Sequence, residues 1–192
     1  SSMGVLCASF KPACVGVIPP QSFNGVTGAC ISQFTPEVFK SINVNQVTYL
    51  ITDALAQITS NQLAMWDTQC SGLTKYQFAN LYANGVCSGI SPVCLSMITP
   101  DAISNMNRMC LRDITPEALS TLHSYQMSHI HSDLFSSWRE EQVAQFGAKS
   151  DACSGLTAQQ VNTLSYTTCG SLSAVCIKQI MPETFSGFKG AC

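Results

Sequence analysis

Apolar residues recur along the chain at alternating intervals of three and five positions, and a glutamine recurs about every sixteen. The pattern occurs twice in full and once in part: Phe39, Ile42, Gln46 and Leu50, then Leu55, Ile58, Gln62 and Trp66, then Leu73, Gln77 and Leu81. Eight residues of continuous helix turn through about 800°, so this apolar stripe would drift roughly 80° per block around one long helix. The pattern therefore predicts short helices separated by breaks.

Residues that favour helix starts stand where breaks are needed. Thr-Pro-Glu occurs at 35–37 and 115–117, and Thr-Pro-Asp at 99–101. Each supplies a capping hydroxyl, a proline where no N–H is required, and a carboxylate in the first turn. Other residues of capping type predict breaks near Asn43, Thr52, Ser60, Ser124 and Ser132. The segment 132–146, which precedes Gly147 and is the only strongly charged one, is expected to be the clearest single helix.

The cysteines reveal a second, longer repeat of about 80 residues. One spacing occurs three times, at offsets of 80 and 82: Cys7, Cys14 and Cys30; Cys87, Cys94 and Cys110; Cys169, Cys176 and Cys192. Cys70 and Cys153 each open the phrase Cys-Ser-Gly-Leu-Thr. The apolar and Gln positions from Phe39 to Trp66 return in the same register as Leu119, Leu122, Gln126, Ile130, Phe135, Trp138, Gln142 and Phe146. We therefore divide the chain into repeats at 7–86 and 87–168 and a partial repeat at 169–192.

A short period within a longer one is typical of a solenoid, in which each coil buries its apolar edge against its neighbours. We predict a mainly α-helical, continuous solenoid of short stacked helices in disulfide-linked repeats. The alternative is a β-solenoid or a leucine-rich-repeat-like coil, in which the glutamines would form a buried ladder. The strict alternation and Gly-rich turns that this alternative requires are weak in the sequence.

If one coil held sixteen residues, cysteines sixteen or seventeen positions apart would lie on adjacent coils, close enough to bond. This rule gives the pairs Cys14–Cys30, Cys70–Cys87, Cys94–Cys110, Cys153–Cys169 and Cys176–Cys192, with Cys7 unpaired or bonded to another molecule. A second scheme gives Cys7–Cys14, Cys30–Cys70, Cys87–Cys94, Cys110–Cys153 and Cys169–Cys176, with Cys192 left over. We favour the first scheme because a single geometric rule covers all of its pairs. Paired cysteines would place the chain in an oxidising, extracellular compartment.

The composition excludes several classes of partner. Only 10% of the 192 residues are charged and the net charge is -2, so the basic surface that nucleic acids or anionic membranes require is missing. Polar residues interrupt every uncharged stretch, which argues against a membrane-spanning helix, and the start of the sequence has no signal-peptide pattern. There is no N-glycosylation sequon, but 24 Ser and 15 Thr are acceptors for O-linked glycans.

Candidate chemical groups are few. His123, His129 and His131 with Asp133 could suggest a metal site. Their counterparts in the first repeat are Asn43, Tyr49 and Ile51, so we expect ordinary surface or half-buried histidines.

The cysteines lack the close spacing of a zinc site. Adjacent residues on a helix diverge by about 100°, so Glu140 and Glu141 are expected to form a solvated face. Trp66 and Trp138 are expected in the core, and the glutamines are expected to bond to backbone groups. We predict no catalytic, cofactor or metal residues.

The function is inferred from architecture. A solenoid without polar end coils exposes stacking surfaces that join head to tail and build open filaments. The sequence Thr-Pro-Glu-x-Phe/Leu-x-x-Ile/Leu-x-x-x-Gln-Val/Met-x-x-Leu/Ile resembles repeat segments of large cysteine-containing extracellular proteins of protists and other microbial eukaryotes. The resemblance implies a surface or matrix role. We expect a secreted structural protein, a subunit or segment of an extracellular filament, coat or wall whose copies join head to tail. The alternative is an adhesin or another module that binds glycans or proteins.

Overall fold

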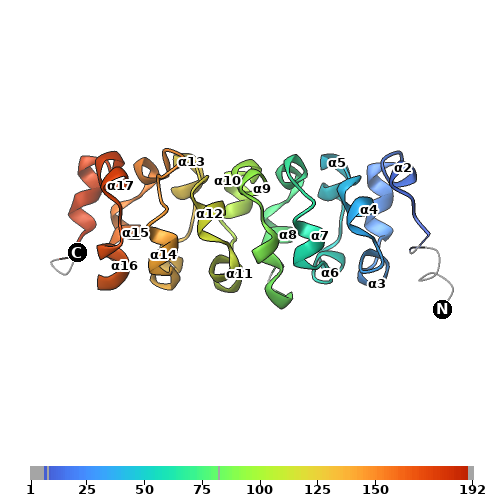
Figure 1. The fold of residues 1–192 in the computed structure, drawn as a ribbon, viewed down its shortest axis with the longest axis horizontal. Coiled ribbons are helices and arrows are strands. Elements are labelled where there is room, and N and C mark those ends of the chain that lie inside the picture. Colours follow the sequence, from blue (N-terminus) through green and yellow to red (C-terminus); the bar gives the residue numbers. More distant parts are fainter. Residues whose placement is uncertain (1–6, 8, 82, 190–192) are drawn as a thin grey trace.

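The computed structural model describes residues 7, 9–81 and 83–189. Short helices follow one another in chain order along the long axis of the molecule, with α2 and α17 at opposite ends (Figure 1). No strand is present among the described residues. The prediction of a mainly helical chain is therefore confirmed, and the β-coil alternative is wrong for this part of the chain.

The elements are α-helices of four to six residues and somewhat more variable 3-10 helices. The α-helices are α2 (Pro12–Val15), α3 (Gly28–Ile31), α4 (Pro36–Lys40), α5 (Val44–Thr48), α6 (Thr52–Leu55), α7 (Ser60–Leu63), α8 (Lys75–Ala79), α9 (Pro92–Met97), α10 (Pro100–Ile103), α11 (Arg108–Asp113), α12 (Pro116–Leu119), α13 (Ser124–Met127), α14 (Glu140–Val143), α15 (Ala158–Asn162), α16 (Tyr166–Gly170) and α17 (Ala174–Gln179). The 3-10 helices are η1 (Pro20–Gly25), η2 (Thr68–Gly72), η3 (Ala83–Gly89), η4 (Ser132–Ser137), η5 (Ala152–Gly155) and η6 (Pro182–Gly187).

Most elements belong to a unit of about eight residues, which we call an octad. In the octad 35–42, Thr35 caps α4 by accepting a hydrogen bond from the Val38 N–H, and Phe39 and Ile42 are buried. Ile42 occupies the eighth position, and the next residue, Asn43, has extended backbone and caps α5. Because each helix restarts at a cap, the buried face does not drift around the helix. The predicted helix starts at the three Thr-Pro-Glu/Asp sequences are all confirmed.

The segment 132–146 is not the single helix that its charges suggested. It consists of η4 and α14, which are separated at Trp138 and Arg139. Arg139 occupies the capping position of α14, and its backbone N–H donates to the Gln142 side chain at 3.0 Å. The octad pattern therefore outweighs the helix propensity of this segment.

Three successive elements make one coil of about 24 residues. Each element from α2 to α15 packs against the third element after it: η1 contacts α5, α4 contacts α7, and η5 contacts α17. The assumption of sixteen residues per coil is therefore wrong. The sixteen-residue period of the glutamines spans only two octads. The chain needs a third octad to complete one coil and return to the same side of the stack.

Six buried glutamines tie each coil to the one before it: Gln46, Gln62, Gln77, Gln126, Gln142 and Gln160. In each case Oε1 accepts the N–H of the residue three positions earlier, which caps the same helix. In Gln160, for example, Nε2 donates to the carbonyls of Met127 and Ile130, both at 2.8 Å. The Met127 carbonyl also accepts the Ile130 N–H at 3.2 Å, so the glutamine adds a second bond there and supplies a partner for the Ile130 carbonyl just beyond the end of the short helix. The predicted role of the glutamines as backbone-bonding groups is confirmed.

Glycines at the ends of four 3-10 helices allow the preceding coil to approach closely. A Cβ on Gly72, Gly89, Gly155 or Gly187 would lie 1.9–2.3 Å from a backbone oxygen, that of Val44, Ser60, Ser124 or Ala158 respectively. Such a distance is impossible without a backbone shift, so these positions require glycine. Gly25 ends η1 in the same way, yet among the described residues nothing lies within 4 Å of the Cβ it lacks.

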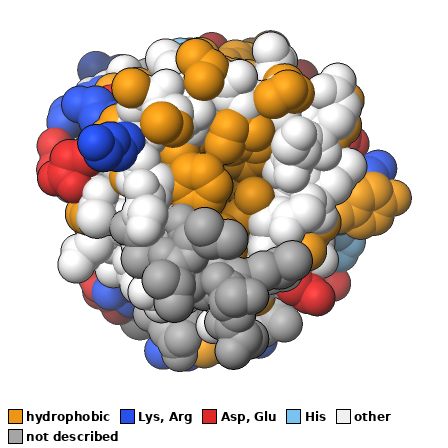
Figure 2. Space-filling view, turned by 90° about the vertical axis from the view of Figure 1, so that its right-hand side faces the viewer, with side chains coloured by type: hydrophobic (Ala, Val, Ile, Leu, Met, Phe, Trp, Pro, Cys, Tyr) orange, Lys and Arg blue, Asp and Glu red, His pale blue; other side chains and the backbone are white. Residues whose placement is uncertain are grey.

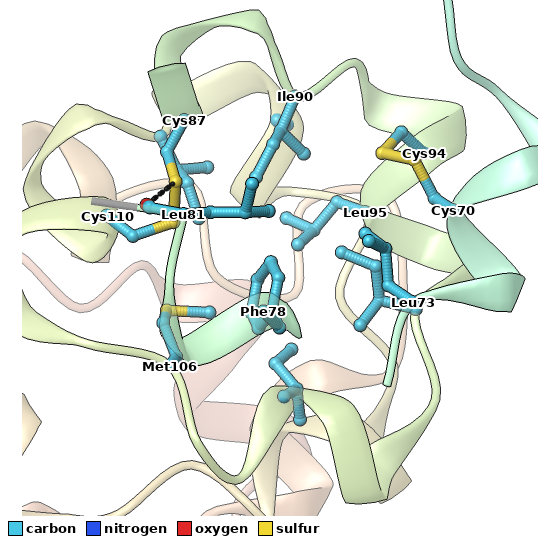
Figure 3. Packing of buried hydrophobic residues seen from close by; sticks show 14 of the residues in the cluster. Cys70, Leu73, Phe78, Leu81, Cys87, Ile90, Cys94, Leu95, Met106 and Cys110 are labelled. Atoms are coloured by element: carbon cyan, nitrogen blue, oxygen red, sulfur yellow. Dashed lines mark hydrogen bonds between the residues drawn. A yellow bond between two sulfur atoms is a disulfide. The ribbon is translucent and has the colours of Figure 1, made fainter. Parts of the chain in front are cut away.

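The core is one continuous column of apolar side chains along the stack. Figure 3 shows the column around Phe78, where the Cys70–Cys94 and Cys87–Cys110 bonds lie on opposite sides of the packed side chains. Trp66 and Trp138 are buried in this column, as the sequence predicted. The division into units at 7–86, 87–168 and 169–192 remains a prediction, because the contacts between coils continue through both junctions.

Candidate functional site: disulfides and end faces

Four disulfides bind cysteines 23 or 24 positions apart: Cys7–Cys30, Cys70–Cys94, Cys87–Cys110 and Cys153–Cys176. This separation equals one coil, so each bond joins two directly stacked octads. In the chain-entropy view, closing a loop of this length stabilises the fold by about 3.4 kcal/mol per bond, before any strain. The four disulfides suit an oxidising, extracellular-like environment.

Both predicted pairing schemes are wrong. The favoured scheme joined residues sixteen or seventeen apart, such as Cys14–Cys30, Cys70–Cys87, Cys94–Cys110 and Cys153–Cys169, which lie two octads apart and therefore on different sides of the coil. The second scheme fails for Cys7–Cys14, Cys30–Cys70, Cys87–Cys94 and Cys110–Cys153, since each of these pairs includes a cysteine bonded elsewhere. Cys169 is disulfide-bonded, but not to Cys153 or Cys176, and Cys192 lies outside the described residues.

Cys14, rather than Cys7, is the free cysteine among the described residues, and it is exposed. Its counterparts in the two later repeats are Cys94 and Cys176, and each of these is bonded to a cysteine one coil earlier. Among the described residues, Cys14 is therefore the one member of its class that is not bonded.

The N-terminal end of the stack exposes residues that point into the core elsewhere. Phe10, Ile18 and Val26 occupy eighth positions of their octads and are half-buried, whereas Ile42 and Leu50 at the same position are buried. We call the surface formed by Phe10, Ile18 and Val26 the N-face. Figure 2 views the molecule from this end and shows hydrophobic side chains gathered near its centre, with few charged side chains next to them.

The C-terminal end also exposes apolar side chains, around a cavity of about 210 Å³ lined by Cys169, Leu172, Ile177, Phe185 and Phe188. We call this lining the C-face. Phe185 is 48% exposed, while its repeat counterpart Phe23 is 1% exposed. Ile177 is 47% exposed, while its counterpart Val15 is fully buried. In the first repeat these positions are covered by the coil that follows.

A surface hollow of about 560 Å³ lies beside α13 and is lined by Ser124, Tyr125 and Glu183 among others. Next to it, the Ser124 hydroxyl donates to an Asp151 carboxylate oxygen at 2.6 Å, and the Ser124 N–H donates to the other at 3.0 Å. These hydrogen bonds hold the pKa of Asp151 below its ordinary value. His123 lies 3.5 Å from the same carboxylate, and its ring stacks on Tyr125.

This cluster does not have the geometry of a nucleophilic serine. A serine nucleophile needs an imidazole to accept its proton, whereas the Ser124 hydroxyl is bonded to the carboxylate itself. The carboxylate instead connects the start of α13 with the segment before η5, one coil later. The cluster therefore stabilises the stack.

The other candidate residues remain apart. His129 Nδ1 lies 2.7 Å from the Tyr125 carbonyl, and His131 Nδ1 lies 3.5 Å from an Asp133 carboxylate oxygen. In the described part of the chain, no three His, Cys, Asp or Glu side chains lie where they could hold a metal ion together. Glu141 pairs with Arg139 at 3.0 Å on the solvent-exposed side of α14.

No known family model matches this sequence, and no curated protein matches it either. Among the described residues, no helix has both the length and the apolar character needed to cross a bilayer.

Proposed function

We propose that this chain is a continuous solenoid that serves as a structural element of a secreted, extracellular filament, coat or wall, extended by copies that stack head to tail. The observation that carries the proposal is the exposure of core positions at both ends of the stack. Side chains such as Phe185 and Ile18 lie in places that are buried wherever another coil is present. Covering them with a further coil would remove apolar surface from water at about 25 cal/mol per Å².

The two faces differ in shape and composition, which favours a heterologous contact. The N-face consists of half-buried side chains of one coil, whereas the C-face surrounds a cavity. A contact between two different faces leaves one of each free at the ends, so it propagates without closing. The low charge of the chain, with 9 basic and 11 acidic residues, supplies little repulsion to oppose this growth.

The disulfides support an extracellular role. A stack held only by short helices and contacts between neighbours opens easily at its ends, because each coil touches only adjacent coils. Bonds between successive coils resist such opening, and they persist where no reducing system acts on them. A wall or filament protein needs this kind of stability.

The test uses two variants that each block one face, Ile18→Lys on the N-face and Phe185→Lys on the C-face. Val93→Lys is the matched control, because Val93 is 49% exposed on α9 in the middle of the stack. We expect the unmodified chain and the control to form fibres in negative-stain images and to sediment as large species, and each blocked variant to remain monomeric. An equimolar mixture of the two blocked variants should form dimers and stop, since it contains one intact N-face and one intact C-face per pair.

Three outcomes would contradict the proposal: an unmodified chain that remains monomeric at high concentration, assembly that the blocked variants do not affect, or blocked variants that fail to form dimers when mixed. A monodisperse monomer that bound glycans saturably would favour the binding-module alternative instead.

A further inference from the structure

Residues 7–30 and 169–192 are two copies of one sequence unit, and the structure describes them in two different environments. Both copies follow one pattern, with Cys at the first position, Cys seven positions later and Ile four positions after that, followed by Pro, Phe and Gly. The described part of the later copy stacks on residues 139–168, through contacts such as η6 with α15 and α17 with η5. The later copy therefore shows what an occupied N-face looks like.

Burial differs between the copies at matched positions. Leu172 and Ile180 in the later copy are 9% and 6% exposed. Their counterparts Phe10 and Ile18 are only half-buried. These positions are covered by the preceding coil in the later copy, and no described residue takes that place in the first.

A glycine gives the same result independently. Gly187 lies against the backbone oxygen of Ala158, so closely that a Cβ there would be 2.0 Å from it. Its counterpart Gly25 has the same 3-10 helix before it and open space where that carbonyl would lie. The first copy therefore has an open recess at Gly25. In the later copy, the matching recess at Gly187 is filled by Ala158 at the start of α15.

The fourth matched position is the cysteine at 14 and 176. Cys176 is buried and bonded to Cys153 one coil earlier, with 5.2 Å between their Cα atoms. Cys94, the counterpart in the second repeat, is bonded in the same way to Cys70. Cys14 at this position is exposed and free.

We propose that the N-face binds a partner segment that forms one further coil of the kind formed by residues 139–168, with one unpaired cysteine that forms a disulfide with Cys14. The bond forms when the two thiols lose two protons and two electrons to a small-molecule disulfide such as oxidised glutathione, which becomes two glutathione thiols. This inference goes beyond the proposed function, because it gives the N-face a second occupant that competes there with the C-face of another copy. The C-terminal coil of a second copy offers no such thiol in its described part, because Cys169 and Cys176 are already bonded.

The test supplies the missing coil from the chain itself. A copy of residues 139–168, in which Cys153 is the only cysteine, is placed directly before Cys7 in the full chain, because the same residues directly precede Cys169. After refolding in a glutathione buffer, alkylation and peptide mapping should find a bond between the added cysteine and Cys14. The alkylated fraction of Cys14 should fall at least tenfold relative to the chain without the addition. The matched control carries Ser in place of the added cysteine and should leave Cys14 reactive.

A Cys14 that stays as reactive as in the original chain would overturn the inference, and so would a Cys14–Cys14 bond between two extended chains. The bonds Cys70–Cys94 and Cys87–Cys110 report whether the extended chain has folded. If it does not fold, a synthetic peptide of residues 139–168 is mixed with the original chain under the same conditions. It should form a mixed disulfide with Cys14 at least ten times faster than a scrambled peptide of the same composition, and equal rates would overturn the inference. Fibre formation does not enter either readout, so the inference and the proposed function fail by different results.

Discussion

The hydrogen bonds of Gln160 allow a direct estimate of what links one coil to the next. Its side chain is 2% exposed and makes three hydrogen bonds to backbone groups, one from the Thr157 N–H and two to the carbonyls of Met127 and Ile130. Gln160→Leu keeps the volume and helix propensity nearly unchanged, but leaves the Thr157 N–H and the Ile130 carbonyl without a partner, whereas the Met127 carbonyl keeps its bond from the Ile130 N–H. At about 1 kcal/mol for each of these two groups, the substitution should destabilise the fold by about 2 kcal/mol.

The neighbouring residue provides the control. Gln159 lies on the same helix α15 and is exposed, and Gln159→Leu removes an amide of the same size from solvent-facing surface. We expect its effect to stay within about 0.5 kcal/mol. Urea denaturation followed by circular dichroism, with the disulfides intact, measures both variants. Equal effects of the two substitutions, or a loss below about 1 kcal/mol for Gln160→Leu, would refute the idea that glutamines join successive coils.

Two further matched pairs test the packing. Gly155→Ala should destabilise the fold by roughly 1–3 kcal/mol, because the added methyl group meets a backbone oxygen of the preceding coil, whereas Gly25→Ala should be nearly neutral. Equal thermal shifts for both would contradict this account of the glycines. Trp66→Phe should cost more than Trp138→Phe when both are compared by denaturant unfolding, because the Trp66 Nε1–H donates to a backbone carbonyl at 3.1 Å, while the buried Trp138 Nε1–H has no described partner. A larger loss for Trp138→Phe would contradict that difference.

The helix starts could be predicted because the forces that fix them are local. A hydroxyl at Thr35 or Thr115 reaches an N–H three residues away, and no distant part of the chain is needed. The burial of Trp66 followed in the same way from its place in the apolar pattern. These features depend on a few adjacent residues, so the sequence alone was sufficient.

The size of the coil could not be predicted in this way. The octad fixes one short helix, but the number of helices per coil depends on the angle at each junction and on which side chains meet across coils. The glutamine period suggested sixteen residues because Gln46 and Gln62 are two octads apart, and the disulfide pairing inherited that error. An 80-residue sequence repeat corresponds to about ten octads, which is three coils and one further element, so equivalent residues of successive repeats lie on different sides of the stack.

The end faces were expected in principle, but their residues could not be named from the sequence. Ile18 and Ile42 occupy the same octad position, and Ile18 is half-exposed because no coil among the described residues covers it. Likewise, Cys14 and Cys94 occupy the same place in the repeated cysteine spacing. Only the stacking of coils reveals that Cys94 is bonded to Cys70 while Cys14 is free.

If three elements make one coil, the disulfides of the purified, unreduced chain join cysteines that lie one coil apart, and a disulfide map shows whether they do. Free thiols are blocked, the chain is digested without reduction, and the linked peptides are identified by mass spectrometry. We expect the bonds Cys7–Cys30, Cys70–Cys94, Cys87–Cys110 and Cys153–Cys176, with Cys14 carrying the blocking group. Bonds between cysteines sixteen or seventeen positions apart, such as Cys14–Cys30 or Cys94–Cys110, would contradict it.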